Sequence, residues 1–502
     1  MTSVKKVTPG GYMTIYLALT VTVIMALCLA LIEGCRYRGI SLETECVMDI
    51  GMDSILAEYH RELQKQYNLF AIDCSYGTES ASTKLTESHL LEYMNRNFSL
   101  EDVFLEKLLY RDFFAVQAEE AQAVKAAFLT DGEGEVFRRV AVDAIEDTVG
   151  IGLLQQLTDW LQVIESRGLE QQDIAGQKQQ IDAQIQEYDG KETTEGKTVH
   201  IENPTAALEE KRNKGLLKLV TEEDNISSRR IETESLLETR MERGEINRGN
   251  MVPGTAENYE EWEALKQKVF FHEYLLRYLG RYGQEKQDSP LWYQTEYVIV
   301  GKDNDTDNLK GIVNRIFVIR EAANTMYLTG SEEKRAIAEL LGEALAAAMM
   351  VPEIGELLAA TLILGWAFAE SVYDVKELLA GEKIPLLKTD ATWHYGLSSA
   401  LQGELPGTSE DASGSDSPGM GYEDYLRIFL LLCEEKSVTC RAMDVVEMDI
   451  RNTPGNRAFR LDTCIVEIAM NVKVKSKYGY SFEIERQKSY IGSLEAIENT
   501  GN

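Results

Sequence analysis

Three aspartates in the middle of the chain have the spacing of a calcium-binding loop. Asp303, Asp305 and Asp307 stand at positions 1, 3 and 5, where such a loop places its first carboxylate ligands. Position 6, normally glycine, is Asn308, and position 12, where a glutamate completes the coordination, is Asn314. The alternative is that these acids cap a helix starting near Asn308, because carboxylates stabilise the free amides of a first turn. We expect capping, with a calcium site as the alternative.

A second acidic group could bind a cation or a basic partner. Glu370, Asp374 and Glu377 are four and three residues apart, so a helix would place them on one face as a ridge. Such a ridge can receive an arginine of another protein. It pairs more often with basic residues of its own chain, of which three are available: Arg315, Arg320 and Lys376.

The cysteines allow disulfide bonds but not a zinc site. Cys28 lies in an apolar segment, and the other six form two groups at opposite ends of the chain: Cys35, Cys46, Cys74, Cys433, Cys440 and Cys464. Disulfides between the groups are possible if the chain ends lie close together, as domain termini often do. The alternative is that they are reduced, buried, small apolar side chains. Two cysteines separated by two residues do not occur, and the five histidines are scattered, so the spacing of a zinc site is missing.

The motifs of common enzyme classes are absent. His272 and Glu273 begin like a zinc-protease helix, but position 276, where the second histidine is needed, is Leu276. The sequence contains neither a phosphate-binding Gly-Lys-Ser/Thr loop nor a Gly-x-Ser-x-Gly elbow. We therefore expect no enzyme and no cofactor, with a hydrolase of scattered acidic residues as the alternative.

The net charge argues against nucleic-acid binding. The chain of 502 residues has 83 Asp and Glu against 51 Lys and Arg, a net charge of −32, and phosphate backbones repel such a polyanion. The charge is uneven, because residues 1–38 sum to +3 and residues 39–502 to −35.

Residues 11–32 predict a membrane span. These 22 residues contain no Asp, Glu, Lys, Arg or His and so carry no charge, and as a helix they would reach about 33 Å, close to the thickness of the hydrocarbon core. A cleaved signal peptide is the alternative, but its apolar region is usually shorter. We place the amino terminus in the cytoplasm and residues 39–502 outside the cell, with membrane lipid as the partner of residues 11–32.

Hydrophobic periodicity favours a mostly α fold with a small antiparallel sheet, an α+β class. Helices are predicted over several long stretches: 42–66, 160–188, 257–282, 309–328, 331–379 with a break near Pro352, and 422–435. Strands are predicted over short ones: 67–73, 294–300, 464–474 and 480–490, the last two as a hairpin. The apolar run 357–369 is too short for a span, so we expect a central buried helix there.

The order of these elements predicts six parts, of which residues 1–38 are a cytoplasmic tip and transmembrane helix, and residues 39–84 a helix and strand that enter the outer domain. Residues 85–250 are predicted as a helical arm that could form a coiled-coil hairpin, exposed or flexible over 206–250, and residues 251–400 as a helical core with one strand. Residues 401–421 are predicted as a disordered loop rich in Gly, Ser and Pro, and residues 422–502 as a helix and the hairpin that completes the sheet.

Several segments together resemble a family of uncharacterised Gram-positive envelope proteins. They are Gly11-Tyr-Met-Thr-Ile-Tyr-Leu, Leu31-Ile-Glu-Gly-Cys-Arg36, Glu58-Tyr59, Tyr67-Asn-Leu-Phe-Ala-Ile-Asp73, Arg320-Glu-Ala-Ala-Asn324, Gly365-Trp-Ala-Phe-Ala-Glu-Ser371, Leu378-Leu-Ala-Gly-Glu-Lys-Ile-Pro-Leu-Leu-Lys388, Tyr422-Glu-Asp-Tyr-Leu-Arg427 and Arg441-Ala-Met-Asp444. The resemblance implies genes neighbouring those of Flp or Tad-type pili, a TadE/TadG-like, pilin-like amino terminus, and other pilus or envelope proteins as partners.

The resemblance also implies a possible prepilin-type cleavage after Gly10 or Gly11. Prepilins carry Glu at the fifth mature position, but here that residue would be Ile15 or Tyr16. We therefore expect a permanently anchored, accessory or assembly component of the pilus, similar to a minor pseudopilin, rather than a subunit of the filament shaft. The alternative is an extracellular binding or adhesion protein that recognises a ligand, cation or basic partner through its acidic surface.

Overall fold

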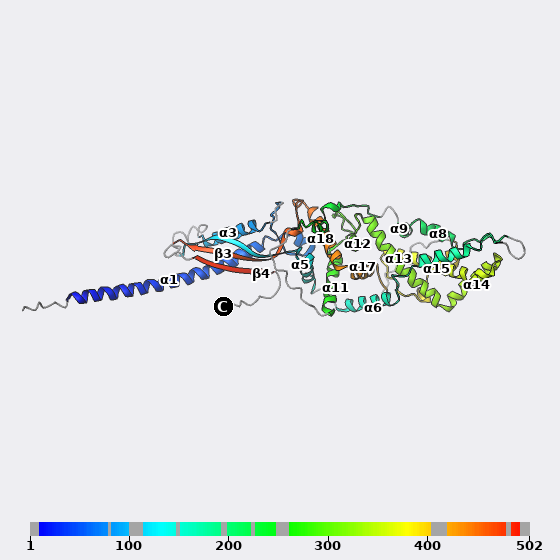
Figure 1. Cartoon of the computed structure of the whole chain (residues 1–502), viewed down its shortest axis with the longest axis horizontal. Helices are drawn as coiled ribbons and strands as arrows, with labels where there is room; N and C mark the ends of the chain where they lie inside the picture. The colour runs from blue at the N-terminus through cyan, green and yellow to red at the C-terminus, as the bar shows by residue number, and fades with distance from the viewer. Residues whose placement is uncertain are drawn as a thin grey trace, which may run out of the picture. The chain divides into compact units, whose positions relative to one another are not determined.

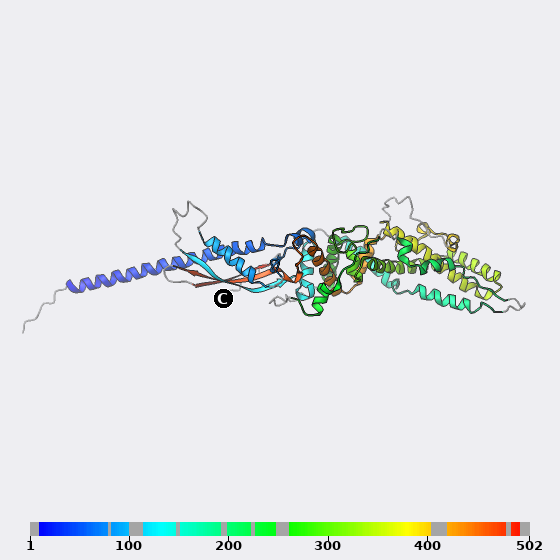
Figure 2. The same ribbon diagram turned by 90° about the horizontal axis from the view of Figure 1, so that it is seen from above.

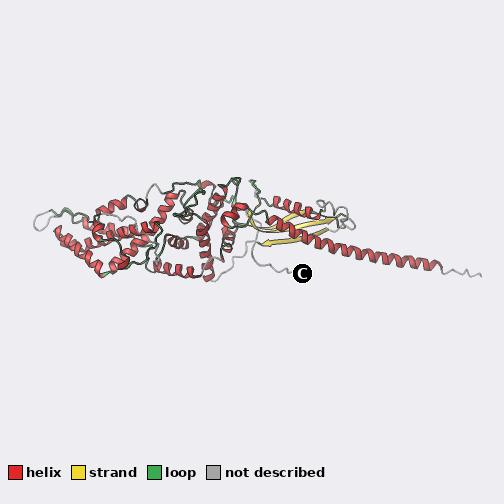
Figure 3. Ribbon diagram, turned by 180° about the vertical axis from the view of Figure 1, so that it is seen from behind, coloured by secondary structure: helices red, strands yellow, loops and turns green. Residues whose placement is uncertain are grey.

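The computed structural model of the protein describes residues 10–78, 82–99, 114–146, 151–191, 198–221, 226–246, 261–402, 419–477 and 483–491. The chain divides into two compact units. One, here called the sheet unit, comprises Met1–Phe137, Asn247–Ala256 and Ala458–Asn502. The other, the helical unit, comprises Arg138–Ile246 and Glu257–Arg457. Figure 3 shows that the strands gather in one sheet and that the rest of the described fold is mostly helix, as predicted.

The sheet unit begins with α1 (Gly10–Leu56), a single helix of 47 residues. Its apolar side chains from Tyr12 to Ile32 are exposed, and it is long and apolar enough to cross a membrane. Burial begins at Ile40 and recurs at helical spacing down to Ile55, so the second part of the same helix packs in the core. The helix predicted over residues 42–66 is therefore two: the end of α1, and α2 (Arg61–Tyr67).

The sheet has four antiparallel strands: β1 (Ile72–Asp73), β2 (Val116–Phe128), β3 (Cys464–Ser476) and β4 (Glu483–Ile491). The central strand β3 pairs with all three others, and its pairing with β4 confirms the predicted hairpin. One face packs its apolar side chains against α1 and α3 (Lys84–Phe98). The opposite face is polar, with ion pairs such as Lys473–Glu120 at 3.2 Å. Figures 1 and 2 show the second half of α1 lying along this sheet.

Side chains tie α1 directly to the strands. Arg486 of β4 lies 3.3 Å from Glu45 of α1, and Lys488 pairs with Asp49 one turn further on. Arg36, just beyond the apolar segment, donates to Ser476 Oγ at 2.5 Å. The helix and sheet are thus held together along their shared length.

The core of the helical unit is built from three successive helices: α13 (Asp305–Gly330), α14 (Glu332–Ala348) and α15 (Gly355–Leu379). The predicted break near Pro352 is present as the short η4 (Pro352–Ile354). α13 and α14 both pack against α15, and the residues of its apolar run are almost all buried. The prediction of a central buried helix is therefore confirmed.

Shorter elements surround this core and complete the fold. They are α5 (Asp131–Asp143), which crosses the boundary between the units in the sequence, α6 (Ile151–Ser166), α7 (Ile174–Gln186), α8 (Ala206–Asn213), α9 (Leu216–Val220), η3 (Thr233–Ser235), α10 (Leu237–Glu242), α11 (Glu261–Tyr278), α12 (Gln294–Val300), η5 (Asp390–Thr392), α16 (Leu397–Leu401), α17 (Tyr422–Leu432) and α18 (Glu435–Arg451), with η6 (Leu461–Thr463) in the sheet unit.

The predicted strand at residues 294–300 is wrong, because these residues form the helix α12. Its β-branched residues suggested a strand, but nearly every side chain of the segment is buried, so the alternation of a half-buried strand has no role there. Gly301 ends the helix in the left-handed conformation (φ 74°), where its N–H donates to the Tyr297 carbonyl.

Residues 206–246 pack on the core, so the prediction of an exposed or flexible arm is wrong for the part that the structure describes. Leu217 and Val220 of α9 are buried against α13 and α15. Arg240 of α10 pairs with Glu447 of α18 at 2.6 Å. Other charged residues of this segment also pair with the rest of the unit, such as Arg212 with Glu321 of α13. Residues 403–418, most of the predicted disordered loop, lie outside the described residues.

The single helical arm predicted at residues 160–188 is two helices. α6 ends at Ser166, Gly168 takes a positive φ of 59°, and Asp173 caps the start of α7 by accepting the Gly176 N–H. α7 packs on α13 and α15. The turn at Gly168 therefore ends the arm before it could form a long hairpin.

Candidate functional site

The predicted acidic ridge on α15 is present as a row on one helix face, but it is buried. Glu370 and Asp374 are completely inaccessible and Glu377 is 4% exposed. Arg320 of α13 donates to Asp374 Oδ2 from two nitrogens, at 2.7 and 3.0 Å. The ridge therefore cannot serve as the exposed partner-binding surface that we considered, because α13 and the chain after α15 cover it.

A second cation completes this buried network. Lys388, also inaccessible, places Nζ 2.6 Å from Glu370 Oε1 and 2.7 Å from Asp374 Oδ1. Of the basic residues considered from the sequence, Arg320 pairs with the ridge, whereas Arg315 pairs with Glu170 at 2.8 Å. Two carboxylates and two cations thus share one buried cluster, here called the ion network: Arg320, Glu370, Asp374 and Lys388.

The charges in the network stabilise one another. Burial alone would raise the pKa of Asp374, but Arg320 and Lys388 hold that pKa below its usual range. Burial likewise works against the charge on Arg320, but the Asp374 carboxylate raises the pKa of this guanidinium above its ordinary value. The pair therefore stays ionised at neutral pH.

The ion network fixes the chain segment that follows α15. Arg320 donates to the carbonyl oxygens of Pro385 and Leu386 at 2.8 and 3.0 Å. Glu370 accepts the backbone N–H groups of His394 and Tyr395, at 3.2 and 2.8 Å. A loop held at both ends by buried charges has little freedom, so the side chains that it presents are pre-positioned.

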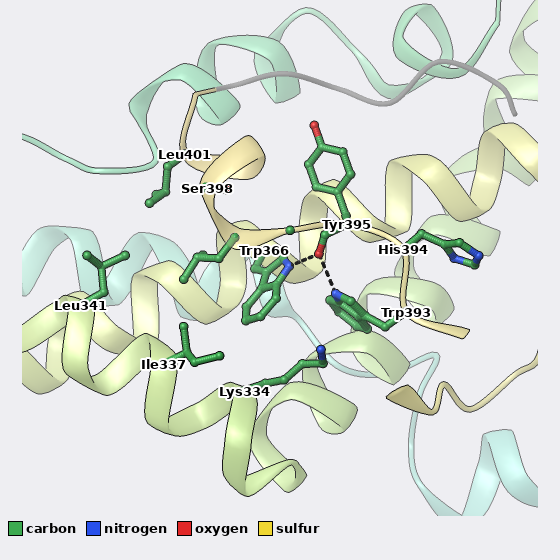
Figure 4. Close-up of a pocket in the computed structure, with 11 residues that line it drawn as sticks. Lys334, Ile337, Leu341, Trp366, Trp393, His394, Tyr395, Ser398 and Leu401 are labelled. Atoms are coloured by element: carbon green, nitrogen blue, oxygen red, sulfur yellow. Dashed lines mark hydrogen bonds between the residues drawn. The ribbon is translucent and has the colours of Figure 1, made fainter. Parts of the chain in front are cut away.

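That loop forms one wall of an aromatic pocket. Trp366 of α15 and Trp393 of the loop both donate their indole N–H to the carbonyl oxygen of Tyr395, at 2.6 and 2.7 Å (Figure 4). The two rings are 5.6 Å apart and almost perpendicular, at 88°. Tyr327 of α13 stacks on Trp393, with 5.1 Å between the ring centroids.

One cation stands over these rings. Lys334 Nζ lies 5.4 Å from the centroid of Trp366 and 5.7 Å from that of Trp393, both within cation–π distance. The pocket has a volume of about 740 Å³, and its remaining walls are mainly aliphatic side chains of α14 and α16: Ile337, Leu341, Leu397 and Leu401. This volume is in the range of pockets that bind small molecules or protein anchors.

The pocket can offer apolar surface and one positive charge. Both indole N–H groups are already satisfied by the Tyr395 carbonyl, so what remains for a ligand is ring faces, aliphatic carbon and the Lys334 ammonium. This arrangement suits an apolar group with an anion beside it. In the part of the chain that the structure describes, no three His, Cys, Asp or Glu side chains converge to hold a metal ion.

The three aspartates of the possible calcium loop are bonded within the protein, and Asn304 Nδ2 donates to both Asp303 Oδ1 and Asp307 Oδ2, at 2.9 and 2.8 Å. Asn304 caps α13 by accepting the Asp307 N–H at 2.8 Å, and Asp303 pairs with Arg230 at 2.6 Å. Asp305 is buried and accepts the Ser227 hydroxyl and the Trp292 N–H, at 2.5 and 3.0 Å. The helix starts at Asp305 rather than near Asn308, and its cap is the asparagine between the acids.

None of the seven cysteines, all of which the structure describes, forms a disulfide. Cys74, Cys440 and Cys464 are buried, Cys433 is partly buried, and Cys35 and Cys46 are exposed on α1. The alternative of buried reduced cysteines thus describes three of the six. α1 starts at Gly10, and whether the chain is cut after Gly10 or Gly11 stays a prediction.

The sheet unit holds a polar cluster that the sequence did not indicate. Glu58, just after α1, accepts the hydroxyls of Tyr76 and Tyr93, at 2.6 and 2.5 Å, and lies 3.1 Å from His89 Nδ1. Partial burial would raise the pKa of Glu58, but these hydrogen bonds lower it below its ordinary value. The cluster joins the end of α1 to α3 and to the turn after β1, so we interpret it as a structural lock.

Sequence reasoning missed the pocket because its residues come from four separate elements. The available signal was the aromatic run Trp393-His394-Tyr395 soon after a buried lysine and a proline. Two of the segments that carried the family resemblance supply Trp366, Glu370 and Lys388. Those segments therefore contribute two of the four residues of the ion network and one tryptophan of the pocket.

Comparison with known proteins gives a family but no activity. Residues 194–476 match a family of unknown function (DUF5702), and this range holds the ion network and the pocket. Since the match covers more than half of the 502 residues, the chain belongs to the DUF5702 family. No curated protein and no solved structure matches the chain.

Proposed function

We propose that this member of the DUF5702 family is a non-enzymatic, membrane-anchored envelope protein, an accessory or assembly component of a Tad/Flp-type pilus or a related surface apparatus. It crosses the membrane once, with its amino terminus in the cytoplasm and residues 39–502 outside. The observation that carries this proposal is that α1 runs without a break from an exposed apolar segment into the core of the sheet unit.

An unbroken helix suits an anchor that must carry load. α1 has 47 residues, or about 70 Å at 1.5 Å per residue, of which the apolar segment needs about half. The remainder is packed on the sheet and tied to it through Arg36, Glu45 and Asp49. A force on the sheet unit would therefore reach the membrane through a continuous ladder of hydrogen bonds rather than through a flexible linker.

The pilus context rests on the resemblance of the amino-terminal and central segments. The departure from prepilins also supports an accessory role, because Ile15 and Tyr16 cannot supply the carboxylate that a shaft subunit uses in the bilayer. A helical unit with a preformed apolar pocket fits a component that holds other proteins in place. We therefore expect partners among pilus or envelope proteins.

Topology and role can be tested separately. Protease treatment of intact cells should remove residues 39–502 and leave a small membrane-protected fragment; full protection would overturn the topology. Deletion of the gene should reduce the number of surface pili, with recovery on expression of the full chain. A deletion strain with normal pili would overturn the role while leaving the membrane anchor intact.

The alternative is an extracellular binding or adhesion protein, and the aromatic pocket is the observation in its favour. The surfaces first considered for binding have changed: the acidic ridge is buried, and the described part of residues 206–246 packs on the core. The two roles differ in one result. A strain in which Trp393→Ala abolishes adhesion while pili remain normal would favour the binding protein.

A further inference from the structure

We infer that the groove between α14 and α16 docks an amphipathic helix of another envelope protein, with an apolar anchor in the aromatic pocket and a carboxylate at Lys334. This inference rests on the proposed function, because an assembly component needs a protein partner. It adds the surface, the kind of partner and the register of its side chains.

The first observation is where apolar surface is exposed. Among the described residues of the helical unit, the three large hydrophobic side chains that are exposed lie on α14 or in the turn after it. They are Ile337 at 45%, Leu340 at 72% and Met350 at 46%. Ile337 also lines the pocket. Exposed apolar residues collected beside a pocket indicate an interaction surface more than scattered ones do.

The second observation is the pattern along α14. Its buried face, Ala338, Gly342 and Ala346, packs on α15, and Gly342 lies so close that a Cβ there would be 2.7 Å from the Ala359 nitrogen. On one side of this buried face runs a second line of side chains spaced alternately three and four residues apart, here called the α14 stripe: Lys334, Ile337, Leu341, Ala344 and Ala348.

The α14 stripe has the spacing with which one helix packs against another. Its first three residues line the pocket, and its last two are small, which lets a neighbouring backbone approach. α14 has 17 residues, or about 25 Å, room for a partner helix of several turns. A small molecule in the pocket would leave Leu340 uncovered, whereas a helix lying along the stripe covers both.

Charge selects the kind of helix. In the described part of the chain, Lys334 Nζ contacts the two indole rings and pairs with no carboxylate. Across the exposed face of α14 stand Glu339 and Glu343, and Glu339 pairs with Arg335 at 3.4 Å. The complementary helix therefore carries apolar residues at three- and four-residue spacing, an acidic residue facing Lys334 and basic residues facing the glutamates.

The same charges disfavour a second copy of this chain as the occupant. The α14 stripe contains no acidic residue to meet Lys334 of another copy. Two copies would instead bring Glu339 and Glu343 towards equivalent glutamates, in a chain whose net charge is −32. A different protein satisfies the groove better.

The experiment places a photo-reactive benzoylphenylalanine at Leu340 of the full chain in its native membrane, with the exposed Lys310 of α13 as a matched position off the groove. We expect a protein cross-link from position 340 and none from position 310. Mapping the cross-linked segment should give an apolar helical pattern with Asp or Glu about two turns from the attachment point, since Lys334 is six residues from position 340. Lys334→Glu should lower the yield about tenfold, and replacing the mapped acid by Lys should restore it.

Several results would overturn the inference: cross-links to lipid or to another copy of this chain, equal yields from both positions, no cross-link, or a yield unaffected by Lys334→Glu. An unchanged melting temperature of the Lys334→Glu protein excludes unfolding as the cause of a loss. The role in the pilus is judged independently. If gene deletion removes pili but no specific cross-link forms, the pilus role is supported and the docking site is rejected. If a partner helix is mapped but pili are normal after gene deletion, the docking site is supported and the pilus role is rejected.

Discussion

In the part of the chain that the structure describes, two helices are long and apolar enough to cross a membrane, and they have opposite environments. In the most apolar window of α1 none of the residues is buried, whereas 78% of that of α15 is buried by other parts of the helical unit. The two apolar runs differ in length. Residues 11–32 are 22 residues without a charged side chain, whereas the run of α15 ends after 13 residues, 357–369, at Glu370. The longer run is exposed and has the length of a membrane span, and the shorter one is covered by other helices of its unit.

The largest expected effect comes from breaking the ion network that α15 needs. Lys388→Met leaves Glu370 and Asp374 with one cation between them, and we expect unfolding of the helical unit to become easier by about 3–5 kcal/mol. Urea unfolding of the detergent-solubilised full chain measures this as a lower midpoint. Lys383→Met, at an exposed position nearby, is the matched control and should change stability by less than about 0.5 kcal/mol. Equal midpoints for the two variants would contradict the role given to Lys388.

Replacing one apolar residue by arginine should have different consequences in α1 and in α15. Val23→Arg at the centre of the apolar part of α1 should disfavour membrane insertion by about 2.5–3.5 kcal/mol, seen as a larger fraction of protein that sodium carbonate extracts from membranes. Leu362→Arg, in the buried part of α15, should instead unfold the helical unit and leave the protein in the membrane. Val23→Leu should change neither quantity. Extraction of the Leu362→Arg protein would show that α15 also contacts lipid.

Glu296 is a further buried carboxylate, and it differs from Glu370 and Asp374 because it accepts hydrogen bonds from uncharged donors instead of pairing with a cation. Glu296 of α12 is inaccessible and accepts the Tyr282 N–H and the Tyr422 hydroxyl, at 2.9 and 2.7 Å. Burial raises the pKa of Glu296 to about 7, from an ordinary value of 4.5. The folded state therefore holds a proton that the unfolded state has released, so this group's stabilisation is complete below pH 4.5 and is lost as the pH rises towards 7.

The test compares wild type with Glu296→Gln at each pH, because the amide resembles the protonated acid. The difference in unfolding free energy should shift in favour of Glu296→Gln between pH 4.5 and 7 and stay constant below. The comparison at each pH also cancels His272, whose pKa is lowered to about 3 by burial and which destabilises the fold as the pH falls below 6.5. A constant difference from pH 4 to 8 would refute the raised pKa of Glu296.

The smallest expected effect is at the surface of α14. Leu340→Ser removes an apolar side chain that is 72% exposed, so we expect the unfolding free energy to change by less than about 0.5 kcal/mol. Leu358→Ser, on the buried face of α15, should cost several times more, about 2–5 kcal/mol. A large loss for Leu340→Ser would mean that the surface beside the α14 stripe is already covered within the protein.

The long apolar patterns predicted their elements well. α13, α14 and α15, with the break at Pro352 and the carboxy-terminal hairpin, follow from local spacing and breakers. β2 does not. Its residues, Val-Gln-Ala-Glu-Glu-Ala-Gln-Ala-Val-Lys-Ala-Ala-Phe, favour a helix, and only the pairing with β3, more than 330 residues later, makes them a strand. The sequence did not predict α18, which begins at Glu435, where the predicted helix 422–435 ends.

The candidate site was predicted only in part. Helical spacing placed Glu370 and Asp374 on one face and gave Arg320 as an available partner, all correctly. The spacing of α15 alone could not show that α13 and the segment after α15 cover that face. An exposed, partner-binding ridge therefore remained a possible prediction from the sequence. Nor could it find the pocket, since Trp366 and Trp393 meet at a backbone carbonyl, that of Tyr395, which carries no sequence signal.

The unbroken course of α1 also sets a rotational phase. Each residue of an α-helix turns the chain by about 100°, so a single residue inserted between Ile32 and Ile40 would rotate the sheet about the axis of the helix by that angle. Four inserted residues would nearly restore the original direction while moving the sheet about 6 Å further from the apolar segment. If that segment is anchored in a membrane as we propose, the length of α1 sets both the direction in which the sheet faces and its height above the bilayer, and a partner on the membrane surface must match both.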